Sequence, residues 1–120
     1  MRVLLIAYDN DSYIHSFPLG LAYIATALKN AGHEVVIYNQ DQYHYPESHL
    51  VDYLKKNRFD VIGVGIVAGY YPYRKLLKIS EAIQSVTNRP FYMIGGHGPS
   101  PEPEYFLKKT GADVVVVIDT

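Results

Sequence analysis

Five short apolar runs are separated along the chain by longer segments in which polar and apolar residues mix. None of these runs alternates strictly between apolar and polar positions, which is typical of parallel strands covered on both faces. The pattern predicts strands at Val3–Ala7, Glu34–Tyr38, Val61–Ile66, Phe91–Ile94 and Asp113–Ile118.

The segments between these runs have helical spacing. In the first, apolar residues recur at intervals of three and four from Leu21 to Ala31, and Gly32 supplies a left-handed cap. Three further helices are predicted: one beginning near Ser48, one through Leu76–Val86 that ends before Pro90, and a short one from Glu102 to Thr110.

This alternation of strand and helix predicts an α/β fold with a doubly wound, five-stranded parallel sheet, flavodoxin-like or Rossmann-like. Right-handed crossovers favour the strand order 2-1-3-4-5. Residues 1–120 are expected to form a single domain. Because the sequence stops directly after the last predicted strand, we expect this domain to be excised from a longer multidomain enzyme.

The composition narrows the classes of function. A content of 48% hydrophobic and 19% charged residues is globular, and a net charge of −1 argues against nucleic-acid binding. With no cysteine, the chain itself offers no thiolate nucleophile, cysteine zinc site or iron–sulfur ligand. Val3–Ala7 is too short for a signal peptide or a membrane span, so we expect a cytoplasmic protein with no membrane partner.

Tyrosine is unusually frequent, with 12 Tyr against 4 Phe and no Trp. Half-buried tyrosines in a sheet protein are the favoured explanation, and an aromatic-lined pocket is the alternative.

In an open α/β sheet, ligands bind beyond the carboxyl ends of the strands, beside the point where the strand order reverses. For the order above, this places a site in the loops 8–20, 65–73 and 95–103, where glycine and aromatic residues concentrate. The first loop carries Asp9, Asn10, Asp11 and His15, which could coordinate a metal; turn formation by Asp and Asn is the favoured alternative.

The second loop follows a stretch that can be scanned as G-x-G-x-x-A, with Gly63, Gly65 and Ala68. The first glycine lies inside the strand, so an NAD(P)-binding fingerprint is disfavoured. Small residues here indicate instead that a flat or bulky group approaches the backbone. Tyr70, Tyr71 and Tyr73 follow directly and could form an aromatic wall beside that group.

The third loop, at Gly95-Gly96-His97, again has few side chains. A phosphate nest is one use for it, but no lysine follows the glycines, so a nucleotide P-loop is rejected. His97 could be a base, a ligand or a simple polar contact. No Ser-His-Asp or paired-carboxylate set is readable, and no catalytic residue or protein metal ligand is predicted.

Two other classes of protein with this fold are disfavoured, because the residues that each of them requires are missing from this sequence. A phosphoacceptor receiver needs an Asp at the end of its third strand, where Gly65-Ile66-Val67 stands. A flavodoxin needs a Ser/Thr-rich phosphate loop after its first strand, and the sequence there, HSFPLG, does not supply one.

The three loops resemble those of the cobalamin-binding domain, which carries D-x-H-x-x-G after strand one, S-x-L after strand three and G-G after strand four. Aligning the helix that follows places Gly20 on the last motif glycine, His15 on the Asp and Phe17 on the His. Gly65-Ile66-Val67 falls on S-x-L and Gly95-Gly96 on G-G.

Among such domains, the chain is most similar to the N-terminal domain of cobalamin-dependent radical SAM enzymes. The stretches that carry this resemblance are FPLGLAYIA at Phe17–Ala25 and IGGHGPSPEPE at Ile94–Glu104. It implies cobalamin bound base-off, with no protein His on cobalt because Phe17 replaces it. The implied cofactor contacts are His15, Phe17, Gly20, Gly65, Val67, Ala68, Gly69, Tyr70, Gly95, Gly96 and His97.

The resemblance also implies a parent enzyme. An iron–sulfur cluster and S-adenosylmethionine would belong to a radical SAM domain of the same parent chain, one such parent being a methyltransferase, and the isolated domain would bind without catalysing. The alternative is a cobalamin-free descendant that serves as a substrate-binding or interface module.

Overall fold

The computed structural model describes residues 1–10 and 19–117, with the side chains of Leu19 and Gly20 left out. The elements in chain order are β1 (Arg2–Ala7), α1 (Leu19–Asn30), β2 (Glu34–Asn39), α2 (Gln40–Tyr43), α3 (Glu47–Lys56), β3 (Val61–Gly65), α4 (Tyr70–Gln84), β4 (Phe91–Gly95), α5 (Pro103–Thr110) and β5 (Val114–Val116).

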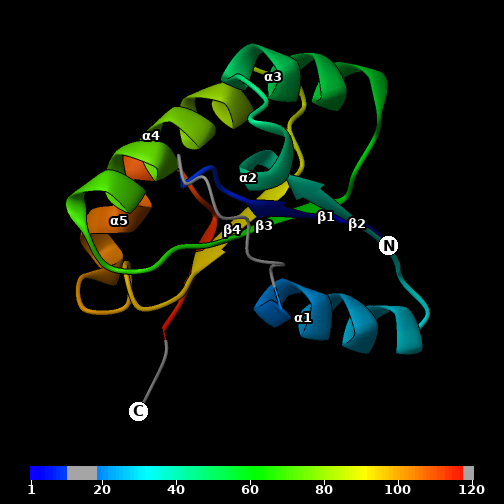
Figure 1. Ribbon diagram of the computed structural model, residues 1–120, viewed down its shortest axis with the longest axis horizontal. Helices are drawn as coiled ribbons and strands as arrows, with labels where there is room; N and C mark the ends of the chain where they lie inside the picture. The colour runs from blue at the N-terminus through cyan, green and yellow to red at the C-terminus, as the bar shows by residue number, and fades with distance from the viewer. Residues whose placement is uncertain (11–18, 118–120) are drawn as a thin grey trace.

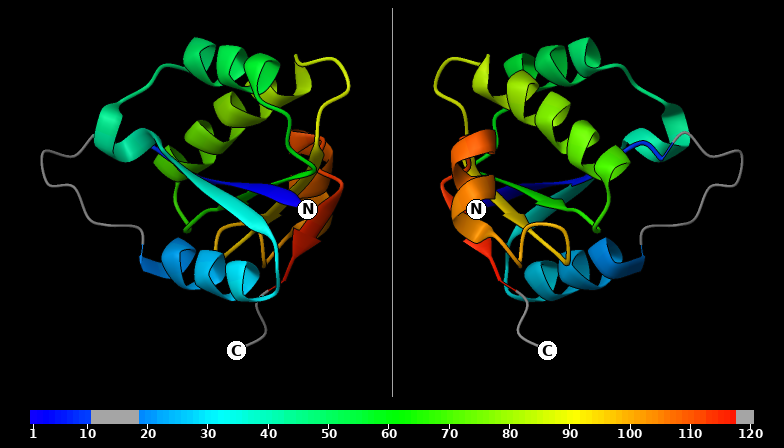
Figure 2. Two further views of the ribbon diagram at one scale, coloured as in Figure 1. Left: turned by 90° about the vertical axis from the view of Figure 1, so that its right-hand side faces the viewer. Right: turned by 90° about the vertical axis from the view of Figure 1, so that its left-hand side faces the viewer.

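The five strands form one parallel sheet in the order β2-β1-β3-β4-β5, which confirms the predicted topology. In Figure 1, α1 lies below the sheet and α2, α3 and α4 lie above it; the side views of Figure 2 show the same division. Since α1 follows β1 and α4 follows β3, the chain leaves these two neighbouring strands toward opposite faces.

The main core lies between the sheet and the α3–α4–α5 layer. Alternate residues of β3 and β4 enter it, namely Ile62, Val64, Tyr92 and Ile94, and they meet Leu76 and its neighbours on α4. A smaller cluster under α1 contains Val3, Leu5, Ala25 and Val35.

α1 covers fewer strands of the sheet than the sequence predicted. α1 packs against β1 and β2, whereas Phe91, Met93, Val114 and Val116, on the same side of β4 and β5, are partly or fully exposed. The strands β3 and β4 therefore alternate in burial, although their apolar sequences predicted cover on both faces.

Two helices depart from prediction. α4 begins at Tyr70, six residues before Leu76, where the predicted apolar stretch starts. α2 was not predicted at all; it is a four-residue turn capped by Asn39, whose Oδ1 accepts a hydrogen bond from the Gln42 amide at 3.0 Å.

Several tyrosines are accounted for by an aromatic cluster between β2 and α3. Tyr38 is buried, and its hydroxyl lies 2.6 Å from Nδ1 of His49, whose ring stacks on Tyr45 with centroids 3.9 Å apart. Tyr53 packs against Tyr38 at 5.4 Å between centroids. This cluster supports the half-buried interpretation of the tyrosine content for these residues.

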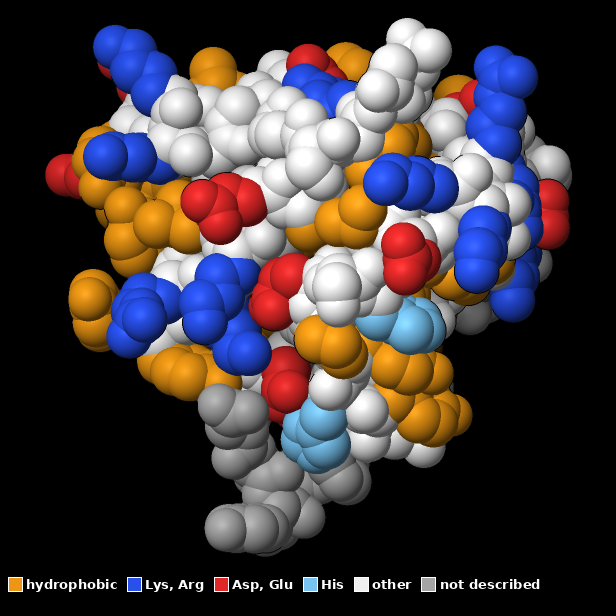
Figure 3. All heavy atoms as spheres, turned by 90° about the horizontal axis from the view of Figure 1, so that it is seen from above, with side chains coloured by type: hydrophobic (Ala, Val, Ile, Leu, Met, Phe, Trp, Pro, Cys, Tyr) orange, Lys and Arg blue, Asp and Glu red, His pale blue; other side chains and the backbone are white. Residues whose placement is uncertain are grey.

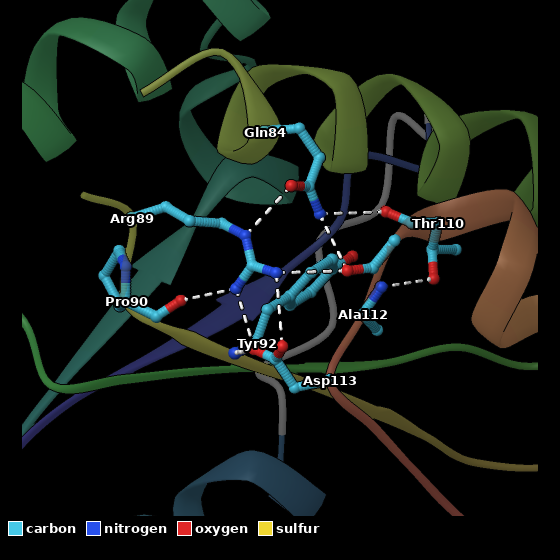
Figure 4. Close-up of polar contacts among 8 residues, drawn as sticks. Gln84, Arg89, Pro90, Tyr92, Thr110, Ala112 and Asp113 are labelled. Atoms are coloured by element: carbon cyan, nitrogen blue, oxygen red, sulfur yellow. Dashed lines mark hydrogen bonds and ion pairs between the residues drawn. The ribbon is translucent and has the colours of Figure 1, made fainter. Parts of the chain in front are cut away.

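The amino edge of the sheet is closed by a polar network (Figure 4). Arg89 donates to both carboxylate oxygens of Asp113, at 2.7 and 3.3 Å, and to the Gly111 carbonyl. Asp113 also accepts from the Tyr92 amide at 2.9 Å, and Gln84 joins the network through Nε of Arg89. The network ties α4, β4 and the α5–β5 connection together.

Figure 3 looks down on the face that carries α3 and α4, and acidic and basic side chains are interspersed across it. This face is not the continuous basic surface that nucleic-acid phosphates require. Within the described ranges, no helix is both long and apolar enough to span a membrane.

Candidate functional site

The carboxyl ends of β1, β3 and β4 meet at one edge of the sheet. The chain turns toward α1 after β1 and toward α4 after β3, so the strand order reverses between these two strands. Ligands of open α/β sheets bind outside this edge. The glycine-rich loops of the sequence therefore end up at the position where the fold class holds its ligands.

Two glycines lie side by side at this edge. Gly65 and Gly95 are register partners on β3 and β4. A Cβ atom built at Gly65 would have no atom of the described residues within 4 Å, whereas one at Gly95 would lie 3.4 Å from Cβ and O of Val116. Gly63 continues the strip toward Leu5 on the α1 side of the sheet. This glycine strip, Gly63, Gly65 and Gly95, is a piece of sheet surface without side chains that opens into free space at Gly65.

Gly96 and Gly98 have a different role. A Cβ at Gly96 would lie 2.4 Å from the Ile66 carbonyl oxygen, and one at Gly98 would lie 2.8 Å from that of Val67. The Ile66 amide donates to the Gly95 carbonyl at 2.9 Å, and the Gly98 amide donates to the Ile66 carbonyl at 3.0 Å. The loop after β4 is thus packed backbone to backbone on the loop after β3. This packing role of Gly96 and Gly98 was not predicted from the sequence.

The remaining predicted contacts of these two loops are accessible. Val67 is 54% exposed and Tyr70 is 75% exposed, and Ala68, Gly69 and His97 are exposed as well. Gly69 is the N-cap residue of α4 and has φ +135°, a backbone conformation that residues other than glycine rarely adopt. The Arg74 guanidinium lies 5.9 Å from the centre of the Tyr70 ring.

Tyr71 and Tyr73 were expected to stand beside Tyr70 as a wall, and the structure gives both of them other contacts. The Tyr71 hydroxyl donates to the Asp9 carbonyl at 3.2 Å. The Tyr73 hydroxyl lies 2.8 Å from that of Tyr105, and this hydrogen bond raises the pKa of Tyr73. Tyr70 is the most exposed of the three, at 75% against 39% for Tyr71.

Tyr8 links the end of β1 to the loop after β3. Burial raises the pKa of its phenol, a hydrogen bond from the Val67 backbone partly offsets the rise, and the negative charge of Asp41 adds to it. The phenol therefore lies within hydrogen-bond reach of the Val67 backbone, beside the exposed part of the edge.

Of the metal-ligand candidates Asp9 and Asn10, Asp9 has a protein partner for its side chain, because its Oδ2 lies 2.9 Å from Nδ1 of His44. The backbone amide of Asn10 donates to Oδ1 of Asp41 at 2.9 Å. Across residues 1–10 and 19–117, no group of three or more His, Asp or Glu side chains could hold a metal ion. These contacts come from α2, which periodicity did not predict because one helical turn is too short to show a period.

Four residues singled out from the sequence are described in part or not at all. His15 and Phe17, and the metal candidate Asp11, lie outside the described residues. Gly20 lies in the first turn of α1, which begins at the same edge of the sheet.

Two recesses on the described surface lie away from the glycine strip. One of about 440 Å³ is lined by Glu102, Pro103, Glu104 and Tyr105 at the start of α5. The other, of about 110 Å³, is lined by Tyr71, Arg74, Lys75 and Lys78 on α4. Neither recess is lined by a residue of the glycine strip.

A doubly wound parallel sheet whose strand order reverses between β1 and β3 defines a flavodoxin-like domain, and the glycine strip lies at the edge where this class of fold holds its ligands. The sequence model of the B12 binding domain family matches residues 8–120, which is nearly the whole chain. The chain belongs to the B12-binding domain family. No curated protein sequence is significantly similar to it.

Solved structures with this fold include TsrM from Kitasatospora setae, a radical S-adenosylmethionine methyltransferase with cobalamin and a [4Fe-4S] cluster bound. It is 23% identical with a TM-score of 0.76, over 92% of this chain and 21% of TsrM. TsrM with tryptophan substrate and aza-SAM bound gives 21% identity and a TM-score of 0.70, over 92% and 22% of the two chains.

The response regulatory domain of mrkE from Klebsiella pneumoniae is 14% identical with a TM-score of 0.60, over 100% of this chain and 84% of that one. All three likenesses concern the fold. The present chain spans about a fifth of the length of TsrM.

Proposed function

We propose that this domain binds cobalamin at the carboxyl edge of the sheet, with the nucleotide tail of the cofactor lying over the glycine strip. The observation that carries the proposal is the open space at Gly65, beside its partner Gly95, in a chain of the B12-binding family. A Cβ at Gly65 would project into that space, so glycine keeps it free for a ligand.

The described residues suit such a ligand. A corrin is a broad and mostly apolar disc rimmed by amides, and it needs accessible apolar surface together with backbone polar groups. Val67 and Tyr70 offer exposed apolar surface at the edge, and the loops at Gly65–Gly69 and Gly95–Gly98 offer backbone. Gly95 and Gly65 would admit the tail. Glycine at position 96 is explained instead by the close packing of the two loops, which leaves no room for a Cβ atom.

The domain would hold cobalamin base-off and leave the cobalt without a histidine from the protein. This part of the proposal is based on Phe17 at the position of the family's ligand His. When bound, the cofactor would supply methyl-transfer chemistry at its cobalt. The residues of this chain would bind it, orient it and keep its lower face free of a protein ligand.

We further propose a radical SAM enzyme, such as a methyltransferase, as the parent. The support is the likeness of this chain to one part of TsrM, whose structure holds cobalamin and a [4Fe-4S] cluster. This chain has no cysteine, so residues outside these 120 would hold the cluster and S-adenosylmethionine. The binding domain alone would then carry no catalytic residue.

A titration with hydroxocobalamin, followed in the visible spectrum, tests the proposal. Binding should shift the spectrum to a base-off form without the signature of a histidine on cobalt. Absence of binding at high micromolar cofactor would contradict the proposal and favour a cobalamin-free substrate-binding or interface module. Lys55→Leu, an apolar change on the exposed face of α3, controls for nonspecific effects of an added side chain.

A further inference from the structure

Three buried polar side chains gather where α2 meets the end of β1. Asp9 is 6% exposed, Gln40 is 1% exposed and Asp41 is 7% exposed. Buried amides and carboxylates are retained only where hydrogen bonds satisfy them, so each of these groups should have a defined partner. None of the three belongs to the glycine strip or to the loops packed beside it.

The chain reaches this arrangement by turning at the end of β2. Asn39 is the last β2 residue and the register partner of Ala7, which ends β1. Helix α2 starts at the next residue, and its single turn brings Gln40 and Asp41 over the segment that continues β1.

Two consecutive side chains of α2 then bond two consecutive backbone amides after β1. Gln40 Oε1 accepts from the Asp9 amide at 3.2 Å, and Asp41 Oδ1 accepts from the Asn10 amide at 2.9 Å. Gln40 also donates through Nε2 to the Tyr45 carbonyl at 2.9 Å, which fixes the orientation of its own amide.

Asp9 is held from two more directions. Its Oδ2 lies 2.9 Å from Nδ1 of His44, and its carbonyl oxygen accepts from the Tyr71 hydroxyl at 3.2 Å. The segment after β1 is thus connected to both α2 and α4. We call the four side chains that hold it, those of Gln40, Asp41, His44 and Tyr71, the β1 latch.

We propose that Gln40 and Asp41 are positioning residues of the cobalamin site, which act by fixing Tyr8, Asp9 and Asn10 at its β1 side. The inference rests on the proposed function and deepens it. Tyr8 precedes the two latched amides and lies next to Val67, so a shift of the segment would displace a side chain at the edge itself. The latch residues themselves need not touch the cofactor.

The test uses the full 120-residue chain, unsubstituted and as Asp41→Leu, Asp41→Asn and Arg89→Ala. Leu has the same branched arrangement of side-chain heavy atoms as Asp, although it is bulkier, and it cannot accept a hydrogen bond from the Asn10 backbone amide, whereas Asn keeps an oxygen for it. Arg89→Ala weakens the network at the opposite edge of the sheet and serves as the stability control. The measurements are the hydroxocobalamin dissociation constant, the thermal midpoint, and hydrogen exchange at the Asp9 and Asn10 amides.

Asp41→Leu should raise the dissociation constant by about tenfold or more, as loss of a supporting partner does at other cofactor sites. Exchange at the Asn10 amide should become faster. Asp41→Asn should stay within about threefold of the unsubstituted chain in affinity, because the accepting oxygen remains. Arg89→Ala should lower the thermal midpoint and leave the affinity unchanged. Should Asp41→Leu fail to fold, Gln40→Met, which keeps chain length but loses both hydrogen bonds, takes its place.

Unchanged affinity in Asp41→Leu, despite faster exchange at Asn10, would overturn the positioning role and leave the proposed function standing. Equal losses of affinity in Arg89→Ala and Asp41→Leu would also overturn the positioning role, because the loss of affinity would then follow from lower overall stability. If the unsubstituted chain does not bind hydroxocobalamin, the proposed function falls first, and the positioning role falls with it.

Discussion

Gly65 and Gly95 are partners across β3 and β4, yet a side chain at Gly65 would enter open space while one at Gly95 would touch Val116 at 3.4 Å. Neither glycine has a positive φ, so the backbone conformation does not require glycine at either position. A substitution at Gly65 therefore tests whether the space above this residue is used by a ligand. A substitution at Gly96 would also strain the backbone, because φ there is +109°.

Gly65→Leu should abolish hydroxocobalamin binding while the chain folds normally. The Cβ of the leucine would meet no described atom within 4 Å, and the rest of its side chain would extend into the space proposed for the nucleotide tail. The measurements are the visible titration and the circular dichroism spectrum. Lys55→Leu provides the matched control, with the same side chain on an exposed surface of α3. Binding by Gly65→Leu with unaltered affinity would rule out this placement of the tail.

Gly96→Ala should lower the free energy of unfolding by about 2 kcal/mol, whether or not cobalamin is present. The added Cβ would sit 2.4 Å from the Ile66 carbonyl oxygen, and the backbone would have to leave φ +109°. Gly65→Ala is the paired variant, and it should change stability by only about 0.5 kcal/mol because nothing lies near its Cβ. Urea unfolding of both variants checks the prediction, and equal stabilities would contradict it.

The strand order and the five strands could be predicted because short apolar runs separated by helical segments allow few topologies. α2 could not be predicted, since four residues carry no period. The early start of α4 was hidden because its first turn, from Tyr70, is mostly exposed and polar or aromatic, and so lacks the apolar spacing that marks Leu76 onward.

For the site, the sequence located the edge and the glycines but did not distinguish their roles. Gly65 and Gly96 look alike in the sequence, and only the backbone shows that one faces open space and the other faces Ile66. The β1 latch was missed because Gln40 and Asp41 meet partners 31 positions away. No local pattern encodes such a contact, which arises from the register of β1 and β2.

Tyr92→Phe should destabilise the chain by about 1–2 kcal/mol. The Tyr92 hydroxyl lies 2.7 Å from Ser80 Oγ in the buried core, where burial raises the pKa of Tyr92 to about 12 and the Ser80 hydrogen bond lowers it. Removing one hydroxyl leaves the other without this partner. Chemical unfolding of Tyr92→Phe, Ser80→Ala and the double variant measures the coupling, and strictly additive losses would contradict a direct interaction.

The Arg89–Asp113 ion pair should make the stability of the domain depend on acidity below about pH 4. The Arg89 hydrogen bonds hold the pKa of Asp113 below its usual value of 3.8, and the Tyr92 amide acts in the same direction. The lowered pKa means that the folded state favours the carboxylate. Its contribution is therefore fully present above the ordinary pKa of Asp and is lost as the pH falls through the lowered pKa of the folded state.

Asp113→Asn, which mimics the protonated carboxyl, should thus lower the free energy of unfolding at pH 7 by about 1 kcal/mol, a value reduced for solvent screening. The Asp113 side chain is 34% exposed, which is why the effect should be modest. The gap between the two proteins should narrow as the pH falls below about 4 and close when Asp113 is protonated in both folded and unfolded chains. Urea unfolding between pH 7 and pH 3 measures this, with Asp52→Asn on exposed α3 as a control that should show no such narrowing. A gap that stays constant across this range would mean that the Asp113 charge does not carry the stability of the amino-edge network.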